Sequence, residues 1–555
     1  MKRRSSLSAL VAGIATVCLS SVALAFQAET PVPATRVERL TYDTMFLSDD
    51  LMEGREAGKR GHDFAAQFVA KRFRSLGMMP VSDENEYLQL IPMKVFRTRY
   101  HGGVRFTIGA DRFEPIVDIV GRTRQQEVML EDARVVFAGW GLVSDEYKRN
   151  DYKKLDVEGA IVVLLQGAPP FLPSDERAYF ASRQIEEAAK RGAAAVITVL
   201  PPGYEEQIMP FDRYADEFLE TQNFAWTGPG GSVAEDPVHG IGHAVMGLDG
   251  LRRIFAQEGL EWEKIAPKLV HPKAKVPRFE LDVPAKMEMG VWEQSALTPN
   301  VVGVIPGRNR MLAGEAIVVT AHLDHRGVQI RDGETFLHSG AIDNASGVAL
   351  MLEMAQELKK RRLARTVVLA AVTGHEANLQ GSDYLAQFRV PGVKKVSAMV
   401  NIDSLLTTFP ISNLVAFGAE HTNFENVVTG AIAGHNLGIA EDPLPDYYHF
   451  TGSDQFSFMK RGIPSIYLAA GIGPEGREPF DTFFQSHHHQ PTDVFELIDF
   501  EQLERMTAVH VDLVRGMANA GQLLDWDDDS FFAEEFKRAD QRADLPQKRR
   551  RRGAN

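Results

Sequence analysis

Several short segments in the second half of the chain combine histidine and carboxylate residues just after apolar runs. His322 directly follows the apolar run 316–321, and the run His487–His489 lies in a later loop. Any one such group could cap a helix or join a hydrogen-bond network. Gathered in one place, however, they would repel one another and lose solvation unless divalent cations bound them. The sequence therefore predicts a metal site that also includes Asp343, Glu376 and Asp403.

The types of ligand indicate the metal and its chemistry. Imidazole and carboxylate without sulfur suit zinc, with cobalt or manganese as substitutes. Five ligands are too many for one tetrahedral site with an open position, so we expect two zinc ions that share a carboxylate. Water held between two such ions becomes acidic enough to attack a carbonyl near neutral pH. Asp324, two residues after His322, is expected to accept the proton of that histidine's other ring nitrogen.

Composition excludes several other classes of protein. The chain has 555 residues and a net charge of −14, which argues against nucleic acid or an anionic membrane as the main partner. Its single cysteine, Cys18, lies in the first 25 residues. If these are removed, the mature chain has no thiol, which excludes disulfides, cysteine-ligated zinc and a cysteine nucleophile.

The first residues are typical of an export signal. Lys2, Arg3 and Arg4 precede an apolar run over 7–24 that ends in a small-residue cleavage site at 23–25. The alternative is an uncleaved membrane anchor, which the serines and threonine within the run disfavour. Because no later segment is long and apolar enough to span a bilayer, we expect a protein of the periplasm or the external medium.

The elements that must position the ligands follow from the apolar periodicity. Strands are expected over 301–305, 316–321, 366–372 and 398–402, and helices over 346–360 and 500–518. This alternation predicts an α/β fold with a mostly parallel central sheet and helices on both faces. Such sheets bind ligands beyond the carboxyl ends of their strands, where the metal-binding residues are expected.

Changes in composition and apolar periodicity along the chain divide it into five parts. Short β-rich runs between about 128 and 285 interrupt the α/β pattern, which indicates an inserted module. The end of the chain is polar and finishes in a basic run, which is typical of a disordered tail. The expected parts are a signal peptide (1–25), an N-terminal part of the main domain (26–127), the insert (128–285), the main part with the metal site (286–520) and the tail (521–555).

The order of the motifs resembles one known family. The segments AHLDH, GAIDNASG, GHEANLQGSDY, NIDS and HHHQPTD are similar to those of the co-catalytic di-zinc aminopeptidases, whose family also contains glutamate carboxypeptidase and glutaminyl cyclase relatives. The likeness covers residues 37 to about 130 and 295–515. The insert, with Phe137-Ala138-Gly139-Trp140-Gly141, resembles a protease-associated domain. The resemblance implies a zinc-exopeptidase-like α/β fold carrying this β-rich insert.

The resemblance also implies how the ligands are shared. One zinc would be bound by His322, Asp343 and Asp403, and the other by Asp343, Glu376 and His489. Asp343 would bridge the two ions, and its bond to Asn344 would be cis. Asp324 would orient His322 by a hydrogen bond to the ring nitrogen that does not bind zinc. The loop 451–456 would lie near the site.

Two positions depart from the family pattern. Members commonly have a glutamate as general base where this chain has His375, and a tyrosine beside the oxyanion where this chain has His488. A neutral imidazole beside dications can still accept a proton from water, so we interpret His375 as a substitute base. An imidazole N–H at His488 can donate the hydrogen bond that stabilises the oxyanion.

These observations predict an exported zinc exopeptidase that acts on peptide or protein amino ends. The alternative is a weakly active or non-catalytic metal-binding or receptor-type homologue, because His375 replaces the usual glutamate. Carboxypeptidase activity and cyclisation of an N-terminal glutamine are less favoured readings. Side-chain preference and oligomeric state do not follow from the sequence.

Overall fold

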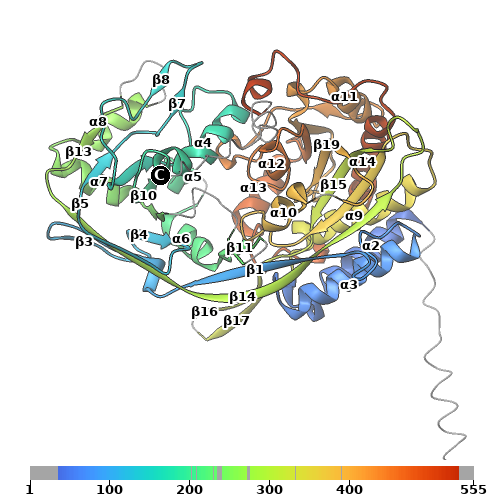
Figure 1. Ribbon diagram of the computed structural model, residues 1–555, viewed down its shortest axis with the longest axis horizontal. Helices are drawn as coiled ribbons and strands as arrows, with labels where there is room; N and C mark the ends of the chain where they lie inside the picture. Colours follow the sequence, from blue (N-terminus) through green and yellow to red (C-terminus); the bar gives the residue numbers. More distant parts are fainter. Residues whose placement is uncertain are drawn as a thin grey trace, which may run out of the picture.

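The computed structural model describes residues 35–536, except for 202, 208, 229–230, 234–240, 270, 272–275, 332 and 389. The expected signal peptide and the basic end of the chain lie outside the described residues. Within the described part, none of the helices is both long and apolar enough to cross a membrane. The chain forms two units that lie side by side (Figure 1).

The first unit is built on a large mixed sheet. Its four central strands, β18, β15, β19 and β22, run parallel, and β14 and β20 flank them in antiparallel orientation. All seven residues of β18 are buried, as expected for a strand covered on both faces. In spatial order the strands are β11 (Phe224–Trp226), β1 (Leu88–Thr98), β14 (Ala285–Ile305), β18 (Thr366–Val372), β15 (Glu315–His322), β19 (Lys395–Ile402), β22 (Ser465–Ala470), β20 (Asn413–Phe417) and β21 (Gly438–Ile439).

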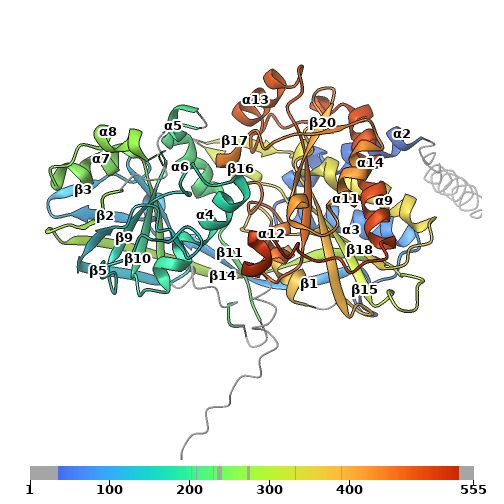
Figure 2. The same cartoon turned by 90° about the horizontal axis from the view of Figure 1, so that it is seen from above.

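Helices cover both faces of this sheet, so the predicted α/β fold is confirmed. On one face, the main core joins the sheet to α2 (Arg36–Leu47), α3 (Arg60–Ser75), α9 (Ser346–Lys359) and α14 (Phe500–Asn519). A smaller core on the other face includes residues of α10 (Gln380–Gln387) and α12 (Gln455–Met459). Figure 2 shows α9 and α14 on one side of the strands and α12 on the other.

The second unit has a sheet of its own. Its spatial order is β13 (Phe279–Glu280), β6 (Val135–Phe137), β9 (Ile161–Leu165), β10 (Ala195–Val199), β12 (Gly242–Met246) and β4 (Ile119–Arg122). The middle strands β6, β9, β10 and β12 are parallel. The helices of this unit include α4 (Ser174–Ala189), α6 (Phe211–Glu220) and α7 (Leu248–Gln257).

This unit differs from the predicted insert in where it begins. It starts before residue 128, because β4 (Ile119–Arg122) pairs with β12, more than a hundred residues later. A boundary at 128 therefore cuts through the sheet, and local composition gives no sign of such a long-range pairing. The long strand β14 extends from the second unit into the first, where it pairs with β1 (Figure 1).

The segment after 520 also differs from the expected disordered tail. Among its first residues, Trp526 and Phe532 are buried, and the ring of Phe532 lies 4.8 Å from that of Phe450. On the side of the second unit, the Phe532 ring lies 5.8 Å from that of Tyr179. Residues 521–536 therefore pack between the two units, because aromatic side chains spaced among the aspartates enter the core. Residues 537–555 lie outside the described part.

This packing makes a prediction about stability. Replacing Phe532 by Ala removes a fully buried ring and is expected to lower the free energy of unfolding by about 3–5 kcal/mol. The exposed Phe64→Ala variant is the matched control and should change it by less than about 0.5 kcal/mol. Denaturant unfolding followed by circular dichroism measures both. Equal stability of the two variants would show that this segment is not packed.

Candidate metal centre

The strand ends deliver the predicted ligands to one edge of the sheet. His322 is the last residue of β15, Asp403 follows β19 directly, and Glu376 follows β18 after a short turn. Because β18, β15 and β19 are adjacent and parallel, these side chains meet beyond their carboxyl ends. Asp343 comes from the turn that precedes α9, and His489 from the loop after α13 (Arg477–Ser486). The structure therefore brings all five predicted ligands together.

The first set of ligands surrounds His322. Its Nε2 atom lies 3.0 Å from Asp343 Oδ1 and 3.0 Å from Asp403 Oδ1. The other ring nitrogen, Nδ1, lies 2.9 Å from the main-chain oxygen of Asp324. The backbone carbonyl of Asp324 thus accepts the proton of that nitrogen. The sequence had suggested that the carboxylate of Asp324 would accept it. The ring is oriented as predicted, but by a different atom.

The carboxylate of Asp324 supports the next strand instead. Its two oxygens accept hydrogen bonds from the backbone N–H groups of His375 at 3.1 Å and Glu376 at 3.3 Å. Burial raises the pKa of Asp324 to about 6. Asp324 therefore positions the start of the loop that carries Glu376.

The second set of ligands surrounds the other oxygen of Asp343. His489 Nε2 lies 3.4 Å from Asp343 Oδ2 and 3.5 Å from Glu376 Oε2. Since Asp343 Oδ1 faces His322, its two oxygens face different sets of ligands. This is the geometry that the bridging role requires.

One histidine in this region was missed by the sequence reasoning. His325 is buried, and its Nδ1 lies 3.0 Å from Glu376 Oε1 and 3.7 Å from Asp343 Oδ2. It directly follows Asp324 in the motif AHLDH, so the signal was present, but only the folded chain turns the ring toward the carboxylates.

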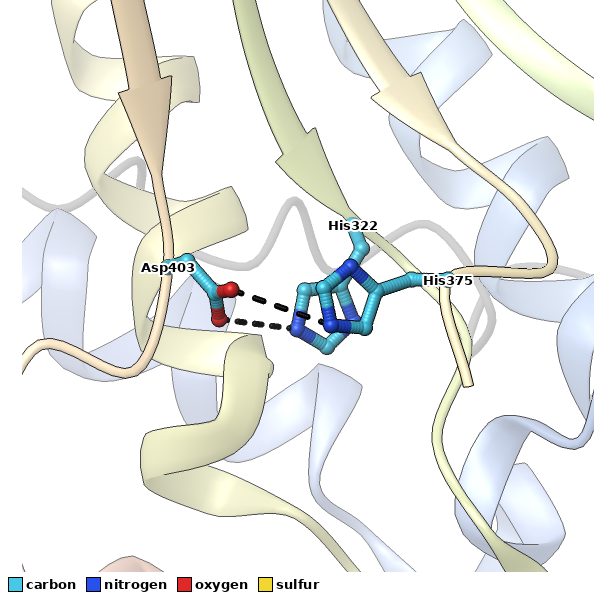
Figure 3. A group of neighbouring side chains, drawn as sticks. All are labelled: His322, His375 and Asp403. Atoms are coloured by element: carbon cyan, nitrogen blue, oxygen red, sulfur yellow. Dashed lines mark hydrogen bonds and ion pairs between the residues drawn. The ribbon is translucent and has the colours of Figure 1, made fainter. Parts of the chain in front are cut away.

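His375 lies on the side of the first set. Its ring stacks on that of His322, with centroids 3.9 Å apart and planes 10° from parallel. Figure 3 shows both rings facing Asp403, which lies 3.7 Å from His375 Nε2. The opposite nitrogen, Nδ1, lies 3.1 Å from a carboxylate oxygen of the fully buried Asp454, a residue to which the sequence had assigned no role.

His488 lies beside the second set. Its ring stacks on that of His489 at 3.9 Å, and the ring of Tyr447 meets it edge-on at 5.9 Å. Burial raises the pKa of Tyr447, and the charges of Glu217 and Asp343 act on it as well. Tyr447 thus packs beside the second set of ligands through the ring of His488. The sequence had given Tyr447 no role, since it lies in a loop without a metal-binding residue.

The turn that carries Asp343 is tightly supported. The Asp493 carboxylate accepts hydrogen bonds from the backbone N–H groups of Ile342 at 2.9 Å and Asp343 at 3.0 Å. The bond between Asp343 and Asn344 is cis, as the family resemblance implied. Buried Arg55 donates to the main-chain oxygens of Leu47, Leu323, Ser339 and Gly340.

The electrostatics of the cluster favour charged side chains. Burial lowers the pKa of His322, but Asp403 and Asp343 outweigh it and raise this pKa well above its ordinary value. Burial raises the pKa of Asp343, yet its bonds to His322 and His489 hold that pKa well below its ordinary value. For His375, Asp454 and Asp403 outweigh burial and the neighbouring His322 and raise the pKa to about 9. Positive charge must therefore accompany the carboxylates.

The donor set fits zinc. It consists of imidazole nitrogens and carboxylate oxygens, which are ligands of zinc at about 2.0–2.2 Å. Donors around one tetrahedral ion at that distance lie roughly 3.3–3.5 Å apart, close to the separations of 3.0–3.5 Å measured in the two sets. Glu376 Oε1 is also buried without a hydrogen-bond partner among the described residues. Zinc ions in the two sets would satisfy these atoms together.

The segment that carries the predicted metal ligands matches a known protein family. Residues 300–514 match the model of peptidase family M28, so this part of the chain is similar to that family. The resemblance predicted from the motifs is therefore confirmed. All of the predicted ligands lie within the matched segment.

Curated relatives and solved structures extend the comparison. A Pyricularia oryzae protein described as "Probable zinc metalloprotease" is 28% identical over 331 residues, which cover 52% of this chain and 61% of that protein. A Pyrenophora tritici-repentis protein with the same description is 40% identical over 243 residues, covering 37% and 48%. The chain thus spans about half to three fifths of the length of these relatives.

Among solved structures, the aminopeptidase from Aneurinibacillus sp. strain AM-1 is similar in fold. The match has a TM-score of 0.51 at 18% identity and covers 88% of this chain and 95% of that one. At this level of identity the likeness establishes the α/β fold alone.

The support of Glu376 by Asp324 makes a prediction about metal binding. In Asp324→Asn one of the two backbone N–H groups loses its acceptor, because the amide offers only one oxygen. We expect zinc affinity to fall about 10- to 100-fold, as measured by competition with a chelating dye. The exposed Asp63→Asn variant should bind zinc like the parent. An unchanged affinity in Asp324→Asn would contradict this role.

Proposed function

We propose that the protein is an exported zinc exopeptidase that removes residues from the amino ends of peptides, with two zinc ions sharing Asp343. The observation that carries the proposal is the division of the Asp343 oxygens between the two sets of ligands. Zinc bound there would polarise the substrate carbonyl and make the attacking water acidic. The match of residues 300–514 to peptidase family M28 supports the choice of a peptide bond as substrate.

The geometry of His375 supports its role as general base. The His375 ring stacks on His322 with the planes 10° from parallel, and its Nε2 atom lies 3.7 Å from Asp403, beside the first set of ligands. That nitrogen is therefore near enough to accept a proton from water bound at the first set. Asp454 holds the opposite nitrogen, so the ring keeps one tautomer during the transfer.

The bound ions would also adjust the charge of this base. Without metal, the pKa of about 9 keeps His375 protonated at neutral pH. Zinc bound at the two sets of ligands would lower that pKa by repulsion. His375 then becomes neutral and can act as a base.

Two side chains are available to stabilise the oxyanion. The sequence pointed to His488, and the structure adds Tyr447, whose ring packs against it. A phenol O–H is a strong neutral donor for a developing negative charge. We infer that Tyr447 shares or takes over the role that the sequence assigned to His488.

The second unit supports the choice of an exopeptidase. Its helix α6, through Glu217, contacts two segments that carry residues of the metal centre. Gln490, next to His489, donates to Glu217 Oε1 at 3.3 Å. Arg326, next to His325, donates to the main-chain oxygen of Glu217 at 2.8 Å. We infer that this unit is a protease-associated domain and that α6 narrows the entrance, so that only chain ends reach the metals. The free amino group would be held by acidic residues at the metal edge. The Aneurinibacillus protein is itself called an aminopeptidase, which supports this direction.

A panel of short peptides tests the proposed activity. Peptides with a free amino end should be cleaved, whereas N-acetylated peptides should be cut at least about 100-fold more slowly because their amino group is blocked. Removing zinc with a chelator, or replacing Glu376 or His322 by Ala, should abolish cleavage, and returning zinc should restore it only in the parent. Preferred cleavage of N-blocked peptides at their carboxyl end would assign a carboxypeptidase instead. A parent chain that binds no zinc would overturn the proposal.

The role of His375 makes a separate prediction. His375→Ala should lower kcat by about 10²- to 10⁴-fold while zinc content stays at the parent value, because the base is lost and the ligands are kept. Asp454→Asn should lower kcat less, since the ring remains but its tautomer is no longer held. Steady-state kinetics with metal analysis measures both effects.

The second candidate function is a non-catalytic binding protein, favoured by the imidazole at a position where a glutamate is usual. If the parent is inactive and His375→Glu creates cleavage, this function replaces the first. If the parent is active and His375→Ala abolishes cleavage, the enzyme stands.

A further inference from the structure

His325 has no place in the set of five ligands, although it lies within it. Its side chain is fully buried, and both ring nitrogens lack a hydrogen-bond partner among the residues that the structure describes. Burying an imidazole without a well-directed hydrogen bond is unfavourable. A buried imidazole beside two carboxylates is therefore suited to binding a cation together with them.

The nearest atoms of His325 belong to the second set of ligands. Its Nδ1 lies 3.0 Å from Glu376 Oε1, close enough for a hydrogen bond, yet neither atom has a partner with the direction that a hydrogen bond needs. The same nitrogen lies 3.7 Å from Asp343 Oδ2. The nitrogen and the oxygens are thus close enough to bind one ion together.

The distances agree with a shared ion. Around Glu376 and Asp343, the contacts of His325 and His489 range from 3.0 to 3.7 Å. Ligands of a tetrahedral zinc lie roughly 3.3–3.5 Å apart, within this range. The rings of His325 and His489 are tilted by 55° with centroids 6.1 Å apart, so they approach from different sides, unlike the stacked pair at the first set.

The ring of His325 is also held in place by the backbone around it. The backbone N–H of His325 donates to the main-chain oxygen of Arg55 at 3.3 Å, which fixes the main chain that carries the ring. Gly340, in the turn before Asp343, has a φ of +56°, and a Cβ atom there would lie 2.5 Å from the His325 ring. The chain therefore leaves room for this ring immediately beside the turn that carries the bridging carboxylate.

We propose that His325 is a fourth protein ligand of the second zinc, through Nδ1, together with Asp343, Glu376 and His489. This inference rests on the proposed function, because it assumes that zinc binds there. The first set would then supply three protein ligands and the second set four, so that zinc would be held more tightly by the second set.

Zinc titration of His325→Asn tests this assignment. The amide nitrogen of Asn takes the place of Nδ1 and keeps its hydrogen-bonding capacity, but it is not a zinc ligand. We expect zinc at the first set to bind as in the parent and zinc at the second set to bind more than about 100-fold more weakly. This loss of affinity exceeds the one expected when a residue that only hydrogen-bonds a metal ligand is replaced. His325→Asp, which supplies a new ligand atom, should recover much of the affinity. Cobalt loading should show a weaker visible absorption of the second ion in His325→Asn.

The controls separate this inference from the proposed function. His510, buried in α14 with its Nδ1 2.8 Å from the Met506 main-chain oxygen, provides His510→Asn as a matched loss of a buried imidazole. Thermal unfolding of the metal-free variants checks that each folds. If His325→Asn binds the second zinc like the parent, the inference is wrong and the proposed function remains. If the parent binds no zinc at all, both fail.

Discussion

Mutual repulsion among the buried carboxylates of Asp343, Glu376 and Asp403 is the constraint on which the rest of the site depends. These groups cannot lie a few ångströms apart in a buried site unless positive charge lies between them. The structure arranges imidazoles around each oxygen of Asp343, which is the arrangement that a pair of divalent cations requires. The strands, turns and supporting residues can be understood as the means of keeping these charges together.

Much of that support comes from groups that never touch the ligand atoms. Arg55 ties four main-chain oxygens beneath the site, and Asp493 and Asp324 hold the backbone N–H groups of the segments that carry the ligands. Because each of these residues binds backbone rather than side chain, the positions of the ligands are set before a metal arrives. Such preorganisation limits the reorganisation needed for binding and catalysis.

The second unit joins this arrangement from a distant part of the chain. The long strand β14 and its partner β1 run between the units, and the aromatic residues of 521–536 pack in the seam between them. Helix α6 is thereby kept against the loop of His489. The relative position of the two units is therefore part of the site and not only of the scaffold.

The sequence by itself determined the ligand types and the strands that carry them. Apolar runs that end in His322, Glu376 and Asp403 are local signals, and parallel strands must present their carboxyl ends at one edge. Local patterns also identified α9 and α14. These predictions succeeded because each depends on a few neighbouring residues.

Only the tertiary structure decided which other side chains meet these ligands. The contact of Asp454 with His375 joins residues almost 80 positions apart, and β4 pairs with a strand more than a hundred residues later. His325 was visible in the sequence, but its orientation depends on the turn at Gly340. The segment 521–536 was predicted to be disordered because it is rich in aspartate, although its aromatic residues pack in the core. Local composition records which residues are present, whereas packing and long-range pairing decide which atoms they reach.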